Sequence, residues 1–221
     1  MFDAGIVKLL GQGTLETLYM IVTSTVLAYA IGLPLGVILQ TTDKNGVCQN
    51  RPVHLVLGVL VNLLRSVPFI ILLVWILPVT RAIVGTTVGS TATVVPLVAS
   101  AAPYVARMVE SSLKEVDGGV VEAAQSMGSS PLQIITKVLL PEARPSLLVG
   151  SAITVTTILG YTAMAGFVGG GGLGAIAINY GYYRYQDDVM LVTVVLLVVL
   201  VQIVQEVGMR VAKRADRRLN H

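Results

Sequence analysis

The chain has 221 residues, of which 54% are apolar and only 12% are charged, and its mean hydropathy is +0.80. Soluble domains carry roughly 25% charged residues, so this composition excludes an ordinary soluble protein and indicates that lipid covers much of the surface. The net charge of +3 gives no indication of a nucleic-acid partner. A single cysteine, Cys48, excludes an internal disulfide framework, and with His54 and His221 it forms no metal-ligand pattern.

Five apolar runs are long enough, or nearly so, to cross a bilayer as helices. They predict spans at about residues 17–39, 53–77, 92–108, 146–168 and 189–207. The N-terminus lacks the basic region of a cleavable signal peptide, so we expect the first run to be a retained span. The sequence therefore predicts an all-α membrane protein with five transmembrane helices, forming a single transmembrane domain over residues 1–221.

Lysine and arginine residues collect on one side of these five spans. Cytoplasmic loops of membrane proteins carry an excess of these residues, which predicts an N-terminus outside and a C-terminus inside. The eleven residues assigned to the inside are Lys44, Arg51, Arg107, Lys114, Lys137, Arg144, Arg210, Lys213, Arg214, Arg217 and Arg218, against Lys8, Arg81 and Arg184 outside.

The first span holds Gly32 and Gly36 at a spacing that permits close helix contact, and we interpret this pair as a packing feature. The second span holds Arg65, a charge that is costly unless it faces water or the bundle interior. Pro68 follows it and can kink the helix. Two interpretations stay open for Arg65: a hinge or an element of a translocation pathway, or an internally paired arginine that locks helix packing.

The longest segment outside the spans covers residues 110–144 and contains strong helix start and stop signals. Asp117 can cap a helix of about two turns over residues 120–127. Gly128 suits the left-handed position that often follows a helix C-terminus. This pattern predicts a short, stiff helix that a partner could use as a lever.

A second helical piece follows in the same segment. Ser130 and Pro131 provide an N-cap and a first-turn proline, and Pro141 interrupts the piece before the fourth span. The apolar residues that we expect on one face are Leu132, Ile135 and Leu139. Ala123 and Ala124 in the first helix have small side chains, so we expect them to let a partner surface approach closely.

The fourth span carries Tyr161 and Met164 toward its outer half, and we hypothesise that they line a pathway near a gate. The alternative is that Met164 only fills packing space. The run of residues 169–174 satisfies GxGxxG, but no strand precedes it, so a nucleotide site is excluded. We expect a flexible or close-packed segment there instead.

The segment 110–144 resembles the EAA loop of bacterial ATP-binding-cassette importer permeases. The matching residues are Glu122, Ala123, Ala124, Gly128 and Pro141, the last preceded by Leu139 and Leu140. Residues 62–75, 102–110, 137–143 and 160–166 further resemble the methionine-import permease of this family. The resemblance implies a type I importer permease fold in the bacterial inner membrane, with those five residues coupling the chain to an ATPase.

The same resemblance implies partners: a second copy of the chain, two cytoplasmic ATPase subunits and an external substrate-binding lipoprotein. It implies import of L- and D-methionine, with no cofactor on this chain and with ATP and magnesium on the ATPase. The chain lacks GxxxxGK[ST], so it supplies no P-loop itself.

Three alternatives remain open at this point. The same class of transporter could import another amino acid or small solute. A secondary transporter would need no ATPase, but the chain has few mid-membrane acids for ion coupling. An intramembrane enzyme would need a nucleophile and a base, and neither His54 nor His221 is placed to act as that base.

Overall fold

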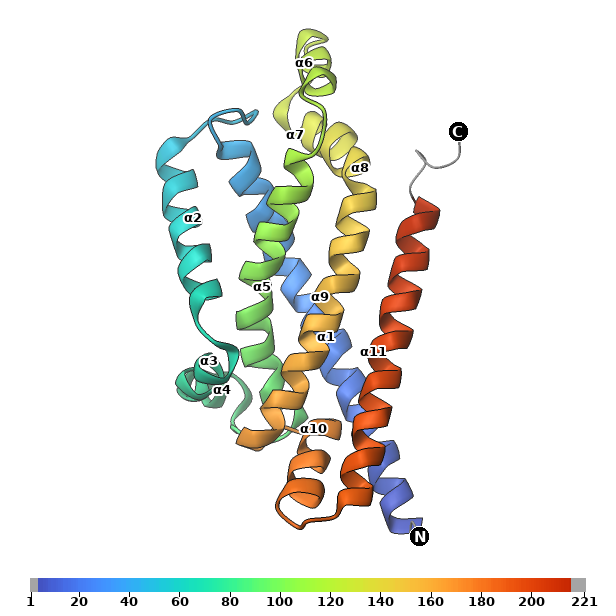
Figure 1. Ribbon diagram of the computed structural model, residues 1–221. Helices are drawn as coiled ribbons and strands as arrows, with labels where there is room; N and C mark the ends of the chain where they lie inside the picture. The colour runs from blue at the N-terminus through green and yellow to red at the C-terminus, as the bar shows by residue number, and fades with distance from the viewer. Residues whose placement is uncertain (1–3, 216–221) are drawn as a thin grey trace. The chain divides into compact units, whose positions relative to one another are not determined.

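The computed structural model describes residues 4–215, with side chains as far as Lys213. Arg217, Arg218 and His221 therefore lie outside the described residues. The described part contains helices and no strand (Figure 1). The elements are α1 (Ala4–Thr42), α2 (Arg51–Ser66), α3 (Phe69–Trp75), α4 (Leu77–Val84), α5 (Ser90–Lys114), α6 (Gly118–Ser126), α7 (Pro131–Ile134), the π-helix η1 (Ile135–Leu139), α8 (Leu140–Glu142), α9 (Arg144–Ala165), the 3-10 helix η2 (Gly166–Val168), α10 (Gly172–Ile176), the π-helix η3 (Ala177–Tyr182) and α11 (Asp187–Ala215).

Four helical segments are long and apolar enough to cross a membrane: Ala4–Thr42, Ser90–Lys114, Arg144–Tyr182 and Asp187–Lys213. The broken pair α2 and α3 raises the number to five if it counts as one span. The first, third, fourth and fifth expected spans fall within these segments. The all-α class with four to five membrane helices is thus confirmed, and the second span is divided.

The division of the second span follows from Pro68. The residue before a proline is disfavoured in the helical conformation, and α2 ends at Ser66, one residue before Val67. Pro68 itself has φ −58° and ψ 135°, and it stands at the N-cap of α3. The sequence indicated a kink at this proline, and the structure has a complete break.

The helices form two compact units. The first unit comprises Met1–Leu27, Val67–Ala101 and Thr154–Gln205, and the second comprises Ala28–Ser66, Ala102–Ile153 and Glu206–His221. The helices α1, α5, α9 and α11 each contribute residues to both units. The single domain over residues 1–221 stays a prediction.

The first unit has an apolar core in which Leu10 of α1, Leu173 and Ile176 of α10, and Val189 of α11 pack together. A carboxylate holds the glycine-rich segment beside this core. The Glu16 carboxylate accepts hydrogen bonds from the Gly172 N–H at 2.7 Å and from the Ser90 hydroxyl at 2.9 Å. The sequence left a flexible or a close-packed segment open for residues 169–174, and the structure has the close-packed one.

In the second unit, α1 and α5 approach closely through Gly32 and Gly36. A Cβ added at Gly32 would lie 2.6 Å from the Ala102 carbonyl oxygen, and one at Gly36 would lie 2.5 Å from that of Ala106. Real Cβ atoms essentially never come so close, so only glycine fits at both positions. The interpretation of this pair as a packing feature is confirmed.

Candidate functional site

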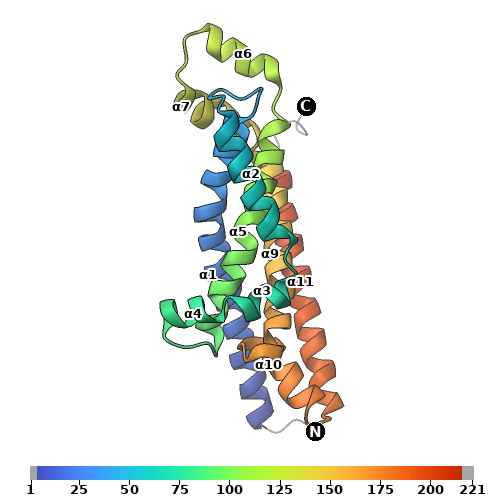
Figure 2. The same ribbon diagram turned by 90° about the vertical axis from the view of Figure 1, so that its left-hand side faces the viewer.

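The helix α6 begins at a side-chain cap and belongs to the second unit. The Asp117 carboxylate accepts a hydrogen bond from the Gly119 N–H at 2.6 Å, which satisfies one of the unpaired donors of the first turn. Within this unit, both views show α6 and α7 projecting beyond the last turn of α5 and the first turn of α9 (Figures 1 and 2). The predicted short, capped helix is therefore confirmed.

The C-terminal end of α6 turns at Gly128, whose φ of +78° lies in the left-handed region. The Gly128 N–H donates to the Gln125 carbonyl at 2.9 Å, and the Ser129 N–H donates to the Ala124 carbonyl at 3.1 Å. These bonds satisfy carbonyl groups that the last helical turn leaves open. Gly128 thus has the conformation that its position in the motif predicted.

The next helix, α7, begins with a reciprocal pair of caps. The Ser130 hydroxyl accepts from the Gln133 N–H at 3.4 Å, and the Gln133 side-chain oxygen accepts from the Ser130 N–H at 2.9 Å. Pro131 follows in the first turn, as predicted.

The expected apolar face of this second piece is only partly correct. Leu139 is buried, but Leu132 is 69% exposed, and the second buried residue is Ile134. The reason is the π-helix η1 over Ile135–Leu139, which widens the turn and changes which residues share a face. Pro141 follows η1, in the short helix α8.

The surface of α6 and α7 carries large, exposed apolar side chains outside the long apolar segments. Met127 is 79% exposed, and Val120 and Leu132 are exposed as well. Glu122 and Ala123 are also exposed, whereas Ala124 is buried at 4%. We expected a partner surface to approach both alanines closely, and in this pair only Ala123 is accessible to one.

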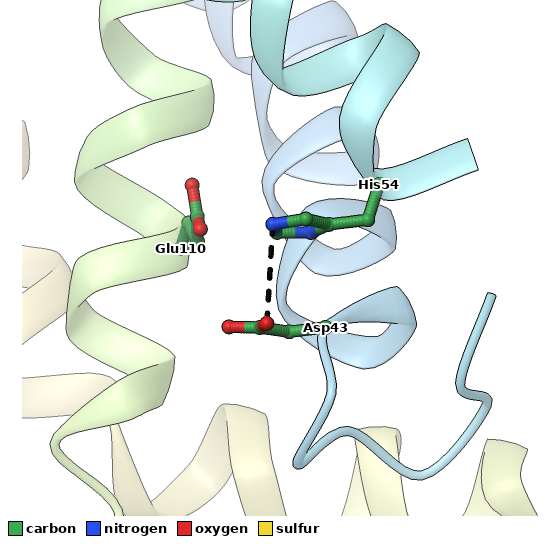
Figure 3. A group of neighbouring side chains, drawn as sticks. All are labelled: Asp43, His54 and Glu110. Atoms are coloured by element: carbon green, nitrogen blue, oxygen red, sulfur yellow. Dashed lines mark ion pairs between the residues drawn. The ribbon is translucent and has the colours of Figure 1, made fainter. Parts of the chain in front are cut away.

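Beside this surface, acidic and basic side chains gather where the ends of α1, α2 and α5 meet within the second unit. Figure 3 shows Glu110 of α5, His54 of α2 and Asp43, which follows α1. The His54 Nε2 atom lies 3.9 Å from the Asp43 carboxylate, and its other ring nitrogen lies 2.9 Å from the Leu39 carbonyl oxygen. Their ligand atoms all lie within 4.8 Å of one another, which is close enough for a metal ion.

Two protein cations already neutralise this group. The Lys114 ammonium lies 2.9 Å from the carboxylates of both Asp43 and Glu110, and the Arg107 guanidinium lies 2.6 Å from Glu110. The hydrogen bond from Lys114, supported by one from the Lys44 backbone, lowers the pKa of Asp43 below its ordinary value of 3.8. These side chains therefore form an ion-pair network.

The network also fastens α5 to α2. Arg107 donates to the Asn62 side-chain oxygen at 3.1 Å and to the Gly58 carbonyl at 3.0 Å. Glu110, which is only 3% exposed, thus joins α5 to α2 through Arg107 and to the α1–α2 connection through Lys114. Lys114 ends α5, three residues before the Asp117 cap of α6.

A polar cavity of about 590 Å³ opens in the second unit, between α2, α5 and α9. The lining residues are Arg65 of α2, Tyr104, Arg107, Met108, Glu110, Ser111, Ser112 and Lys114 of α5, Glu115 after it, and Ser146, Val149, Gly150 and Ile153 of α9. The guanidinium of Arg65 lies over the Tyr104 ring, 5.9 Å from its centroid. Arg65 forms no ion pair within the described residues, so the cavity holds an unneutralised cation.

The other two predicted pathway residues lie in the first unit, on α9. The Tyr161 ring stacks on Phe69 of α3 with centroids 4.4 Å apart. Met164 is 45% exposed. Their part in a pathway, like that of Arg65, stays a prediction.

The sequence interpretation missed the roles of Glu110, Lys114, Asp43 and Glu16. Glu110 and Lys114 stand four residues apart, the spacing at which opposite charges pair on a helix, so that pair was open to prediction. Asp43 and Glu16 act on residues far away in the chain, and no local pattern indicates those contacts.

Comparison with known proteins identifies the family. Residues 32–221 match the model of the binding-protein-dependent transport system inner membrane component. The chain is 55% identical, over 95% of its length and 93% of the relative, to the probable D-methionine transport system permease protein MetI of Vibrio cholerae. It is 48% identical to the D-methionine transport system permease protein MetI of Escherichia coli, over 72% of this chain and 73% of that one.

The fold agrees with these matches. A chain from crystals of the MetNI methionine ABC transporter in inward-facing conformations is 46% identical and superposes with a TM-score of 0.96, over 98% of this chain and all of that one. A chain of an amino acid ABC transporter is 20% identical with a TM-score of 0.73, which shows a shared fold. The protein therefore belongs to the family of binding-protein-dependent transport system inner membrane components, and it is a permease subunit of an ABC transporter.

Proposed function

We propose that this chain forms the membrane pathway of an ATP-driven importer of methionine and receives force from a separate ATPase through α6 and α7. The observation that carries the coupling part is the surface of α6 and α7. An exposed Met127 at the end of a short, capped helix is costly in water and suits a groove in a partner. Methionine as the substrate is supported by the names of relatives that match nearly the whole chain.

The proposal assigns the coupling role to Glu122, Ala123, Ala124, Gly128 and Pro141. Glu122 and Ala123 are exposed on α6 and would meet the ATPase directly. Ala124 and Gly128 would act indirectly, since the first is buried and the second fixes the turn after α6. A helix held by caps at both ends can pass a displacement to α5 and α9 without bending.

The proposed partners are a second copy of the chain, two ATPase subunits and an external binding protein. ATP and magnesium would be bound by the ATPase subunits. The solved MetNI transporter supports an assembly with an ATPase. The excess of lysine and arginine supports a cytoplasmic position for α6, with the N-terminus outside and the C-terminus inside a bacterial inner membrane.

The pathway is proposed to pass Arg65, Tyr161 and Met164. Arg65 supports this because it is a cation without an ion partner in a polar cavity, among the residues that the structure describes. Met164 supports it through its exposure on α9. Tyr161 is held by its stack on Phe69 and would form a fixed wall.

Uptake of labelled methionine into proteoliposomes tests this function. The vesicles contain the chain with its ATPase, and the binding protein is added outside. We expect uptake that requires ATP and is competed by unlabelled methionine but not by glutamate or lysine. Uptake of another solute would retain the transporter class and reject methionine, and uptake without the ATPase would reject ATP coupling.

A further inference from the structure

We propose that Arg65, positioned by Tyr104, is a carboxylate-binding subsite for the transported amino acid within the polar cavity of the second unit. This inference rests on the proposed transport function and deepens it. It names the group of the substrate that the permease contacts and the residue that contacts it.

Three cations and the carboxylates of Glu110 and Glu115 line the cavity, and Arg65 is the one of these cations without an ion partner among the described residues. Arg107 and Lys114 also line the cavity, but both are bonded to the Glu110 carboxylate, and Lys114 is bonded to Asp43 as well. Arg65 has no hydrogen bond or ion pair within residues 4–213. Its guanidinium lies over the face of Tyr104, which orients the group without neutralising its charge.

The position of Arg65 makes this free charge expensive. Arg65 lies fourteen residues after Arg51, the first residue of α2, which is about 21 Å along the helix at 1.5 Å per residue. The apolar core of a bilayer is about 30 Å thick, so a helix that starts at one surface carries Arg65 deep into it. A charge at that depth must face water or a counter-ion, and the Arg65 side chain is exposed beside the polar residues of the cavity.

The chemistry of the cavity matches an amino acid. A guanidinium presents paired donors that fit a carboxylate in a bidentate manner. A volume of about 590 Å³ is within the range of small-molecule sites, roughly 300–1,000 Å³. Met108, Val149 and Ile153 line the same space and offer apolar contact to a side chain.

The contact is also suited to transport because it is moderate in strength. Net movement requires a site that attracts the substrate and still releases it. The Arg65 side chain is exposed, so solvent would screen its bond to a carboxylate. Since every amino acid carries the α-carboxylate, this subsite would recognise the substrate class and leave the choice of side chain to other contacts.

The test uses the complex of permease and ATPase, without nucleotide, and a thiol in the cavity wall. Cys48→Ser removes the native thiol, and Ser111→Cys places one at an exposed, cavity-lining position of α5. Labelling by a neutral maleimide is measured against increasing methionine, N-acetylmethionine or methioninamide. We expect protection by the first two ligands, which keep the carboxylate, and none by methioninamide.

Two arginine variants complete the test. Arg65→Gln should raise the methionine concentration needed for half-protection at least about tenfold, the loss expected for a hydrogen-bonded charge. Arg81 is an exposed arginine of α4 outside this cavity, so Arg81→Gln should leave the concentration for half-protection unchanged. Three results would overturn the proposal. Arg65→Gln could leave the methionine concentration for half-protection unchanged, methioninamide could protect the thiol as well as methionine does, or methionine could give no protection.

These outcomes are separable from failure of the proposed function. ATP-dependent methionine uptake by the same Cys48→Ser, Ser111→Cys parent reports on the function itself. If uptake proceeds but ligands with and without the carboxylate protect the thiol equally, only the subsite is rejected. If Arg65→Gln does not assemble, the comparison of methionine with methioninamide on the parent still decides the question.

Discussion

Gly128 shows how one residue sets the shape of the coupling segment. Its φ of +78° is strained for any residue with a Cβ, although no atom lies within 4 Å of the position such a Cβ would occupy. Replacing it with alanine therefore isolates backbone strain from steric overlap. The conformation was predictable from the sequence because the requirement is local.

We expect Gly128→Ala to lower stability by about 1 kcal/mol, the usual cost of the left-handed conformation. This corresponds to a melting temperature lower by roughly 3 °C. Because the turn after α6 is displaced, less methionine should be imported per ATP hydrolysed. Gly11→Ala in α1, also open within 4 Å but without a positive φ, is the control. If both variants have the same melting temperature and import the same amount of methionine per ATP, backbone strain at Gly128 is not the cause.

Glu110 is the residue on which the ion-pair network depends. Its carboxylate is buried and bonds both Arg107 and Lys114. In Glu110→Gln these cations lose their shared counter-charge. We expect a loss on the order of 2 kcal/mol, less than for a fully buried pair because Lys114 is partly exposed.

The measurement is thermal unfolding of the purified complex, with Glu206→Gln as the matched control. Glu206 forms an ion pair with Arg210 four residues away, but both side chains are mostly exposed. Such surface pairs contribute little, so the control should unfold near the parental temperature. If the two variants unfold at the same temperature, Glu110 is not the centre of the network.

At the scale of elements, local signals predicted helix ends better than helix faces. The caps at Asp117 and Ser130 each depend on atoms within three residues, so the sequence was sufficient. The π-helix η1 has no comparable local signal. Because of it, Ile134 is buried where the sequence pattern predicted Leu132. The break at Pro68 was indicated as a kink, because sequence alone does not show how far a chain turns after a proline.

The connection between α1 and α2 should respond to acid through Asp43. Its pKa is lowered in the folded protein, chiefly by the hydrogen bond from Lys114. A lowered pKa means that the stabilisation is present above the unfolded value and is lost as pH falls through the folded value. We therefore expect Asp43→Asn to be less stable than the parent near neutral pH.

The difference in stability between the parent and Asp43→Asn should become smaller as the pH falls below 3.8, the ordinary pKa of an aspartate. Melting temperatures of both proteins in the same buffers measure this gap. Because both proteins are measured in the same buffers, the difference between their melting temperatures is the informative quantity. A gap that stays constant to the lowest pH would show that Asp43 does not contribute through its charge.

At the scale of the whole molecule, composition and charge pattern were strong guides. An apolar chain can satisfy its backbone in lipid only as helices or a closed barrel, so the all-α class followed from the hydropathy. The EAA pattern pointed to the family because its residues are close in sequence. The cavity around Arg65 was not predictable, because it depends on how α2, α5 and α9 come together.

Photocrosslinking shows whether α6 and α7 contact an ATPase in the assembled transporter. A benzophenone amino acid replaces Met127 in the reconstituted complex, and the same residue replaces Val195, an exposed apolar position of α11. We expect a crosslinked product with the combined mass of permease and ATPase from position 127 and none from position 195. No ATPase crosslink at position 127, or equal crosslinking at both positions, would contradict this contact.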